Sequence, residues 1–236
     1  AWNMMRALGV VTLPITENQR LQGLITIGDI ANAYMDVYDN HILSRARTQY
    51  KNIVETLNGT LLAGNEHAYF LRGKVVVATG SRDVIEECIE SDDLVIVGDR
   101  DETHICALEE NASCMVVTGG TQVSAQVLEM ANRRDCVVII TPYDTFTAAR
   151  LINQSMPIKY FMKKENFVTF DIDDYVDEVR EVMSKKRHRD FPVLDDQRRY
   201  LGMVSRRNLL NMHKKKLILV DHNEKSQAID GIEGAE

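Results

Sequence analysis

The sequence has no long hydrophobic run and is short of positive charge. It has 28 Lys and Arg against 35 Asp and Glu, a formal net charge of −7, and this balance argues against a dedicated nucleic-acid binder. No apolar stretch approaches the roughly 20 residues of a membrane-spanning helix, and no secretory leader pattern opens the chain. These absences predict a soluble protein, and a hydrophobic fraction of 44% is ordinary for a globular chain.

Cysteine is scarce, and its four copies lack the spacing of a metal site. Cys88, Cys106, Cys114 and Cys136 lie in the middle of the chain, and none of them forms a C-x-x-C pair. Such cysteines are typical of reduced core residues rather than of disulfides or a zinc site. We therefore expect a cytoplasmic protein with buried thiols.

A duplicated stretch is the most informative feature that is present. LQGLITIGDIANA, residues 21–33, has a near copy in YLGMVSRRNLL, residues 200–210, with Gly23 matching Gly202. Each copy predicts a strand that passes through a tight turn into a helix. The chain therefore contains a repeated unit with a different segment between the copies.

A hydroxyl side chain ends the strand in each copy, and a carboxylate or amide follows three residues later. These residues are Thr26 and Asp29 in the first copy, and Ser205 and Asn208 in the second. The amides at a helix N-terminus attract an anion, and a carboxylate accepts hydrogen bonds from ribose hydroxyls. The pattern favours a sugar-phosphate ligand. Asp29 is expected to hold the ribose better than Asn208, because the amide carries no charge.

Short elements surround the first copy. Apolar residues between Trp2 and Leu8 predict a helix that ends at Gly9. Two strands follow, and then a helix over residues 29–37. A second amphipathic helix is expected over residues 42–57, where it would lead out of the first unit.

From about residue 60, continuously apolar strands alternate with helices. KVVVATG, DLVIVGD, SCMVVTGG and CVVIITP are each followed by a helical pattern. Strands of this kind predict a parallel sheet covered on both faces, and we expect a small doubly wound α/β domain. Ser81 and Asp144 are expected to cap two of its helices.

The last third repeats the opening unit more completely. Strands are expected at 166–170, 191–194 and 201–205, with helices at 174–186 and 206–212, so the first unit lacks the opening strand of this β-α-β-β-α order. Residues 159–216 contain fifteen Lys and Arg against ten Asp and Glu. This local positive charge suits a compact anionic ligand.

Two families are suggested by these patterns. The order x-P-V/I-x-D/E…L-x-G-x-V/I-T/S-x-x-D/N, present as LPITE…LQGLITIGDI and FPVLDD…YLGMVSRRNLL, resembles the cystathionine β-synthase (CBS) domain. CBS domains pair into a Bateman module that binds adenine nucleotides. The middle segment resembles the DRTGG domain, whose split motif stands here as Asp99-Arg100 and Thr118-Gly119-Gly120. The fold class expected is α/β, with two paired CBS motifs and an inserted small parallel α/β domain.

The C-terminal segment KLILVDHNEKSQA resembles a strand of family II, manganese-dependent inorganic pyrophosphatases of the DHH superfamily. In a subgroup of these enzymes a CBS–DRTGG–CBS block is inserted before this strand. Asp221 matches a manganese ligand of the parent enzyme, but its partner ligands are missing, so we expect no hydrolysis by this chain. The tail beyond about Leu219 is expected to be disordered or non-native. The expected domains are CBS motif 1 with its linker helix (1–58), the DRTGG domain (59–156), CBS motif 2 (157–215) and the start of the catalytic DHH domain (216–236).

The resemblance and the chemistry together imply one nucleotide site shared by the two motifs. Its candidate residues are Thr12, Thr26, Ile27, Gly28, Asp29, Lys163, Lys164, Val168, Arg187, His188, Arg189, Asp190, Ser205 and Asn208. The first motif would anchor the sugar, and the basic residues of the second would hold phosphate or base. The alternative is that the run KKRHRD is a solvated helix end whose positive charges offset the helix dipole.

The function that this resemblance implies is adenine-nucleotide sensing by the regulatory region of a pyrophosphatase. AMP or ADP would inhibit the parent enzyme, ATP or diadenosine polyphosphates would activate it, and two chains would associate through the CBS and DRTGG domains. Neither nucleic acid nor membrane is expected as a partner. The alternatives are a structural dimerisation insert and a CBS module for another adenosyl ligand, such as S-adenosylmethionine. A catalytic middle domain is a further rival. However, no nucleophile stands beside a base, and Thr118 to Thr121 lacks the lysine of a P-loop, so that turn is expected to serve packing or a dimer contact.

Overall fold

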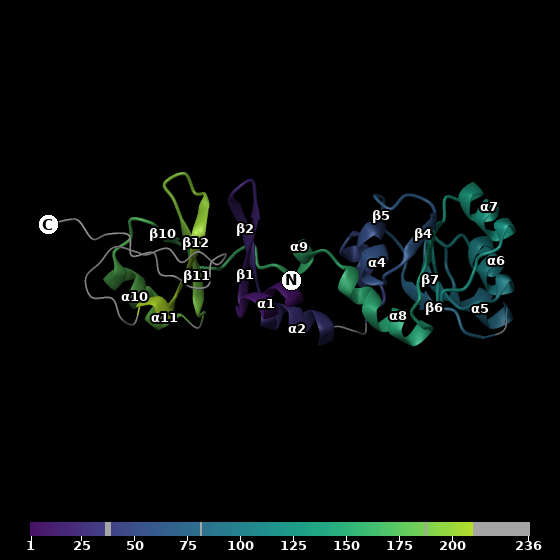
Figure 1. The fold of residues 1–236 in the computed structure, drawn as a ribbon, viewed down its shortest axis with the longest axis horizontal. Coiled ribbons are helices and arrows are strands. Elements are labelled where there is room, and N and C mark those ends of the chain that lie inside the picture. The colour runs from purple at the N-terminus through teal and green to yellow at the C-terminus, as the bar shows by residue number, and fades with distance from the viewer. Residues whose placement is uncertain (36–38, 81, 187, 210–236) are drawn as a thin grey trace. The chain divides into compact units, whose positions relative to one another are not determined.

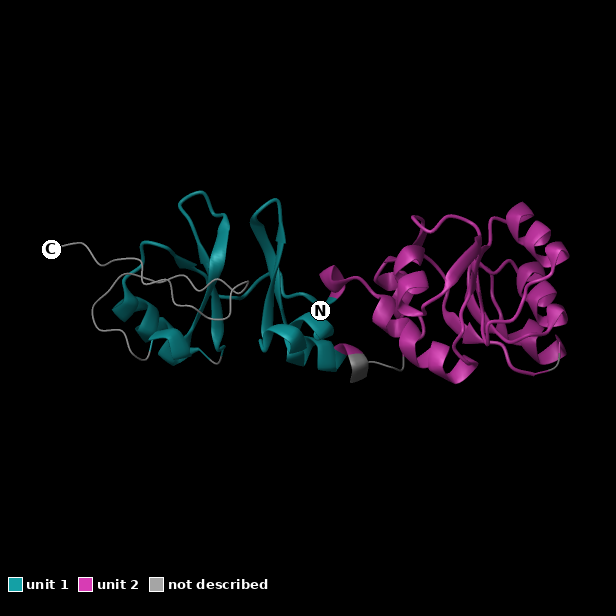
Figure 2. Ribbon diagram, in the orientation of Figure 1, with its two compact units in different colours: residues 1–32, 161–236 teal, residues 33–160 magenta. Residues whose placement is uncertain are grey.

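The structure is a computed structural model, and it describes residues 1–35, 39–80, 82–186 and 188–209. The chain divides into two compact units, shown in Figure 2. Unit 1 contains residues 1–32 and 161–236, and unit 2 contains residues 33–160. Asp221 and the predicted tail lie outside the described residues. Within the described ranges, no helix is long and apolar enough to cross a membrane.

The first copy of the motif is a helix, a β-hairpin and a second helix. Its elements are α1 (Trp2–Leu8), β1 (Thr12–Glu17), β2 (Arg20–Thr26) and α2 (Ile27–Met35). Gly9 ends α1 in the left-handed conformation at φ 66°, as predicted. The hairpin strands pair antiparallel, with Thr12 opposite Thr26. Consequently, the start of β1 lies beside the turn that begins α2.

The second copy has the predicted β-α-β-β-α order (Figure 1). Its elements are β10 (Phe170–Asp171), α10 (Val176–Lys185), β11 (Asp190–Leu194), β12 (Tyr200–Ser205) and α11 (Arg206–Leu209). β11 is the central strand, parallel to β10 and antiparallel to β12. The opening strand is shorter than the predicted 166–170. A core that includes Phe170, Val179, Met183, Phe191 and Val204 joins α10 to the sheet.

The two copies contact each other through the backbone inside unit 1. The amide of Leu24 donates to the carbonyl of Lys163 at 2.9 Å, and the amide of Lys163 donates to the carbonyl of Leu24 at 2.7 Å. Near the hairpin tips, the amide of Tyr200 donates to the carbonyl of Gln19 at 2.7 Å. The segment that leads into the second copy is therefore tied to β2 of the first.

Unit 2 is built on a five-stranded sheet. Its strands are β4 (Thr60–Ala63), β6 (Val75–Val77), β7 (Leu94–Val97), β8 (Cys114–Val117) and β9 (Val137–Ile140), in the order β4-β9-β8-β7-β6. The strands β6 to β9 are parallel, as the apolar runs predicted. β4 is an antiparallel edge strand, which the sequence patterns did not reveal.

Helices cover both faces of this sheet, but the winding differs from the prediction. Figure 1 shows α5 (Arg82–Cys88), α6 (Asp101–Glu109) and α7 (Ala125–Arg133) on one face, and α4 (Tyr50–Thr56) and α8 (Thr145–Leu151) on the other. The four parallel strands follow one another across the sheet in one direction. Right-handed crossovers in a constant direction place their helices on one face. The sheet is therefore wound in one direction, and the expected double winding was wrong.

The helix expected over residues 42–57 was also wrong. That segment forms α3 (Ile42–Arg45), β3 (Thr48–Gln49) and α4, and β3 pairs with β5 (Tyr69–Phe70). Arg47 lies between α3 and β3 at φ 52°, a left-handed conformation that a continuous helix does not contain. The pairing with a strand some twenty residues away overrode the local helical pattern. The 3-10 helix η1 (Ile152–Ser155) follows α8, and the boundary between the two units falls within α9 (Ile158–Phe161).

Helix caps in unit 2 test two further predictions. The side chain of Asp144 accepts a hydrogen bond from the amide of Thr147, which confirms it as the cap of α8. Ser124, which was not predicted, caps α7 in the same way. Ser81 lies outside the described residues.

Candidate functional site

The turn between β2 and α2 is closed by a reciprocal set of hydrogen bonds between Thr26 and Asp29. The amide and hydroxyl of Thr26 donate to Asp29 Oδ2 at 2.8 and 2.6 Å. In return, the amide of Asp29 donates to Thr26 Oγ1 at 3.2 Å. This is a capping box, a common device for starting a helix. The two residues predicted to hold a ligand therefore also have a structural role.

Lys163 adds positive charge beside this turn. Its Nζ lies 3.3 Å from Asp29 Oδ1, and the side chains of the two residues are 50% and 12% exposed, respectively. Burial alone would raise the pKa of the Asp29 carboxyl. The hydrogen bonds from Thr26 and the ammonium of Lys163 outweigh this effect and hold the pKa below its usual value. Asp29 is thus a carboxylate at neutral pH, and one of its oxygens faces a cation.

A cleft in unit 1 brings residues of both copies together. It is lined by Thr12, Leu24, Thr26, Lys163, Asn166, Phe167, Val168, His188, Arg189, Asp190 and Phe191. Seven of these eleven belong to the predicted nucleotide-binding set. Asp29 lies next to the lining, because it contacts both Thr26 and Lys163. The cleft combines apolar walls, a hydroxyl, a carboxylate and cations, which is the mixture that small polar ligands require.

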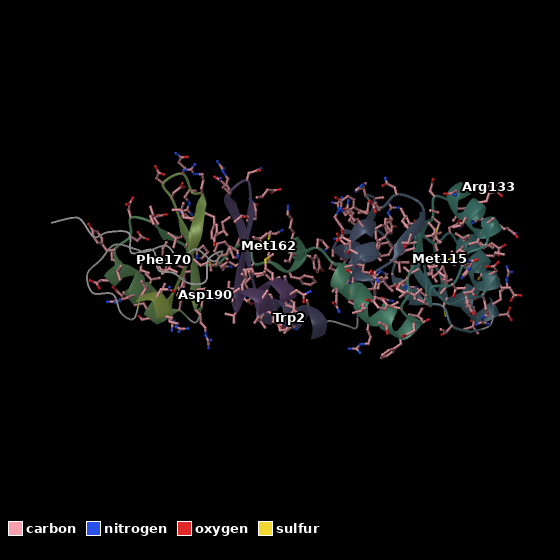
Figure 3. The ribbon with its side chains drawn as sticks, viewed as in Figure 1. Trp2, Met115, Arg133, Met162, Phe170 and Asp190 are labelled. Atoms are coloured by element: carbon pink, nitrogen blue, oxygen red, sulfur yellow. The ribbon has the colours of Figure 1, made fainter. Side chains whose placement is uncertain are left out.

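Gly23 explains how Lys163 comes so close to β2. A Cβ atom at Gly23 would lie 2.5 Å from the carbonyl oxygen of Lys163 and 3.1 Å from Met162 Sδ. Figure 3 labels Met162 on this crossing segment. Only glycine permits the paired backbone bonds between Leu24 and Lys163. The repeat revealed Gly23 in the sequence, but its role depends on a segment 140 residues further along the chain.

The basic stretch before β11 contributes to the cleft in part. His188 and Arg189 are exposed residues of its lining, and Asp190 begins β11. The imidazole of His188 stands edge-on to the ring of Phe191 at 6.5 Å between centroids. Arg187 lies outside the described residues. His188 and Arg189 thus line the cleft while remaining exposed, and both the ligand-binding role and the solvated helix end stay open for this stretch.

The remaining predicted residues that the structure describes are not among the lining residues. Ser205 and Asn208 form their own capping box, in which the amide and hydroxyl of Ser205 donate to Asn208 Oδ1. Ile27 and Gly28 open α2, and Lys164 follows Lys163 on an exposed stretch. Sequence reasoning missed four lining residues: Leu24, Asn166, Phe167 and Phe191. In the sequence, the three apolar residues fitted the pattern of buried strands and gave no indication of a binding role. No local pattern distinguished Asn166.

The Thr-Gly-Gly turn of unit 2 does not form an anion cradle. Gly119 and Gly120 have φ values of 77° and 66°. Their amides donate to the carbonyls of Tyr143 and Thr141, each at 2.8 Å. Because these amides are already bonded, they cannot surround a phosphate as the amides of a P-loop do. The turn joins the loops after β8 and β9, so its visible role is packing.

The four cysteines of unit 2 differ in burial. Cys106, Cys114 and Cys136 are buried as predicted, whereas Cys88 is exposed, contrary to the expectation. Burial raises the pKa of Cys114, and that of Cys136 to about 12, so these thiols remain protonated. Among the described residues, no group of three or more His, Cys, Asp or Glu could hold a metal ion. These features give no support to the rival of a catalytic middle domain.

Unit 1 contains two copies of a CBS-type motif that share a mixed polar and apolar cleft, and unit 2 is an α/β unit with the Asp-Arg and Thr-Gly-Gly turns. Together these features define the class of CBS–DRTGG modules. Comparisons with known proteins agree with this class. The family model of the DRTGG domain matches residues 52–155, and that of the CBS domain matches residues 158–214.

Two relatives and one solved structure indicate the kind of protein in which this module occurs. The chain is 39% identical over its full length to the cobalt-dependent inorganic pyrophosphatase of Clostridium perfringens, and 33% identical over 99% of its length to the "Probable manganese-dependent inorganic pyrophosphatase" of Thermotoga maritima. It spans only 43% and 42% of these two relatives. A similar solved structure is the crystal structure of the CBS and DRTGG domains of the regulatory region of Clostridium perfringens pyrophosphatase, complexed with the activator diadenosine tetraphosphate. It matches this chain with a TM-score of 0.83 and 37% sequence identity, and the match covers 87% of this chain and 90% of that one.

The chain belongs to the family of CBS–DRTGG regulatory regions of inorganic pyrophosphatases. The resemblance recognised in the sequence is thereby confirmed, and so is the α/β fold with its CBS and DRTGG parts. Most of the chain corresponds to the regulatory part of such an enzyme, because the solved regulatory region covers 87% of it.

Proposed function

We propose that this chain senses adenine nucleotides and thereby regulates a metal-dependent inorganic pyrophosphatase of which it is a part. The observation that carries the proposal is the cleft of unit 1. Thr26 and Lys163 line this cleft, and the Asp29 carboxylate contacts both the hydroxyl of Thr26 and the ammonium of Lys163. This set can bind the sugar and the phosphate of one nucleotide at the same time.

The similar region from Clostridium perfringens supports an adenosine-containing ligand, because it was crystallised with diadenosine tetraphosphate, its activator. For this chain we propose the same class of activator, together with ATP, and we propose AMP and ADP as inhibitors. The apolar lining from Phe167, Val168 and Phe191 suits an adenine ring. The basic residues Lys163 and Arg189 suit the phosphates.

Regulation requires that a nucleotide bind one arrangement of the protein more tightly than another. A bias of about 1–3 kcal/mol would change the affinity or activity roughly 5- to 150-fold. The parent reaction would be hydrolysis of diphosphate to two phosphates, with the metal held by the catalytic domains. Asp221 is the proposed contribution of this chain to the metal site. A homodimer formed through the CBS and DRTGG domains, in the cytoplasm, is the proposed setting.

A thermal-shift screen tests the proposal. The ligands are AMP, ADP, ATP, diadenosine tetraphosphate, S-adenosylmethionine and pyrophosphate, because anything that binds only the folded state raises the melting temperature. We expect shifts with the nucleotides and the diadenosine ligand, and none with pyrophosphate. If none of these ligands raises the melting temperature, the result would favour a structural dimerisation insert. If only S-adenosylmethionine raises it, the result would favour a CBS module for that adenosyl ligand.

The regulatory part of the proposal needs the full-length parent enzyme. Its rate of pyrophosphate hydrolysis is measured with and without AMP and diadenosine tetraphosphate. The expected result is a lower rate with AMP and a higher rate with the diadenosine ligand. A rate that neither ligand changes, in a protein that binds both, would refute regulation while leaving binding intact.

A further inference from the structure

Lys163 lies where the sugar-binding and phosphate-binding parts of the cleft meet. Its ammonium is 3.3 Å from Asp29 Oδ1, yet the residue also lines the cleft and half of its side chain is exposed. A lysine side chain is a flexible point charge with three donors. From this place the ammonium can contact either the carboxylate or an anion in the cleft.

Asp29 has only one oxygen left for a ligand. Oδ2 accepts two hydrogen bonds from Thr26, and these bonds start α2. Oδ1 faces the ammonium of Lys163. A ribose hydroxyl that binds to Asp29 must therefore approach Oδ1 and displace or share the cation.

The backbone of Lys163 cannot move away to make room. Two hydrogen bonds hold it to Leu24, and the absence of a side chain at Gly23 lets it approach. A rearrangement at this place is therefore confined to the side chain of Lys163. The four methylene groups of that side chain allow the ammonium to turn from Asp29 into the cleft.

We propose that Lys163 makes the cleft selective for phosphorylated adenosine ligands, because a phosphate draws the ammonium away from Asp29 while a ribose hydroxyl takes its place on Oδ1. This inference rests on the proposed function and names the residue that distinguishes phosphorylated from unphosphorylated ligands. With a nucleotide, both charges of the ion pair keep a partner. A neutral nucleoside displaces the ammonium of Lys163 from Asp29 but offers the ammonium no anion in exchange. A cationic adenosyl ligand such as S-adenosylmethionine meets the ammonium directly.

Arg189 also lines the cleft and can contribute to phosphate binding. The two cations differ, however, because the structure gives Lys163 an ion pair with Asp29 and records none between Arg189 and Asp29 among the described residues. Removing either charge weakens phosphate binding. Only the loss of Lys163 also frees Asp29 Oδ1 for a neutral nucleoside.

The test is calorimetric titration of AMP and of adenosine into the wild-type chain and the variants Lys163→Met, Lys163→Arg, Arg189→Met and Lys51→Met. For Lys163→Met, we expect AMP affinity to fall about tenfold or more, since a charged hydrogen bond is lost, while adenosine affinity holds or rises. The ratio of the two affinities falls accordingly. Lys163→Arg should keep the wild-type preference. Lys51→Met, a matched loss of charge at an exposed pair with Glu55 in unit 2, should change neither affinity.

A second variant guards against a folding defect in Lys163→Met. In Asp29→Asn both ligands lose the carboxylate, while Lys163 loses its competing partner, so both affinities fall and the preference for AMP rises. An unchanged AMP-to-adenosine ratio in Lys163→Met, or a lower ratio in Asp29→Asn, would overturn the inference. Wild-type chain that binds neither AMP nor diadenosine tetraphosphate would instead refute the proposed function, and this inference with it.

Discussion

The two copies of the repeated motif have the same backbone arrangement but differ in charge. Thr12 lies opposite Thr26 in the first copy, as Asp190 lies opposite Ser205 in the second. In each copy the amide of the residue after the hydroxyl donates to the residue just before the neighbouring strand. Ile27 donates to the carbonyl of Val11 at 3.0 Å, and Arg206 donates to that of Arg189 at 3.2 Å. Both hairpins also have a register irregularity beside the matching glycine.

The difference lies in the group that remains for a ligand. The capping box of the first copy leaves a carboxylate oxygen paired with Lys163. The capping box of the second uses Oδ1 of Asn208, which has no charge to offer. A capping box is thus compatible with ligand binding only where its acidic residue has a second oxygen. This difference favours our proposal that the first copy anchors the sugar, and four predictions test it.

The largest effect is expected from Asp29→Ala compared with Asn208→Ala. Loss of the carboxylate should weaken AMP binding about tenfold or more, because a charge-assisted hydrogen bond is removed. Asn208→Ala should change it no more than a few-fold. Calorimetric titration measures both, with thermal unfolding to allow for the lost caps. Equal losses in the two variants would mean that the copies do not differ in the proposed way.

The next effect concerns the close crossing that occurs in the first copy. Gly23→Ala is expected to cost about 1–3 kcal/mol of unfolding free energy, because its Cβ would meet the carbonyl of Lys163 at 2.5 Å. Gly28→Ala is the matched control. There the new Cβ would lie 3.6 Å from Thr26 Oγ1, an ordinary contact, and an alanine in a helix should be neutral or stabilising. Urea unfolding measures both, and a neutral Gly23→Ala would refute the close approach.

A pH dependence should distinguish the two capping boxes. Folding lowers the pKa of Asp29 below 3.8, its ordinary value, so the ionised carboxylate stabilises the folded state. That stabilisation is present above 3.8 and is lost as the pH falls through the lower, folded pKa. The difference in unfolding free energy between wild type and Asp29→Asn should therefore shrink on acidification below 3.8. Asn208→Ala should show no such change in its difference, since the amide does not titrate.

The smallest effect is expected when the second copy is made to resemble the first. Asn208→Asp places a negative charge in the first turn of α11, where it should stabilise the protein by about 0.3–1 kcal/mol. Thermal unfolding at low and high salt would measure this, because screening reduces the gain. A destabilised variant would indicate that Asn208 lies among other carboxylates.

Much of the fold and part of the site were predictable from local patterns. The repeat located both capping boxes, and the alternation of apolar strands and helices predicted the parallel strands of unit 2. The missed features depend on residues far apart in the sequence. β4 joins the sheet beside β9, and β3 interrupts a helical pattern to pair with β5. The lining residue Asn166 and the role of Gly23 likewise follow from the crossing of residues 162 and 163 over β2.

A crystal structure of this chain with AMP would test the central claim most directly. We expect a ribose hydroxyl within hydrogen-bond distance of Asp29 Oδ1, and the ammonium of Lys163 turned from the carboxylate to the phosphate. We also expect the adenine to lie against the apolar lining near Phe167 and Phe191. A nucleotide held instead by Ser205 and Asn208, or at the Thr-Gly-Gly turn of unit 2, would contradict the account.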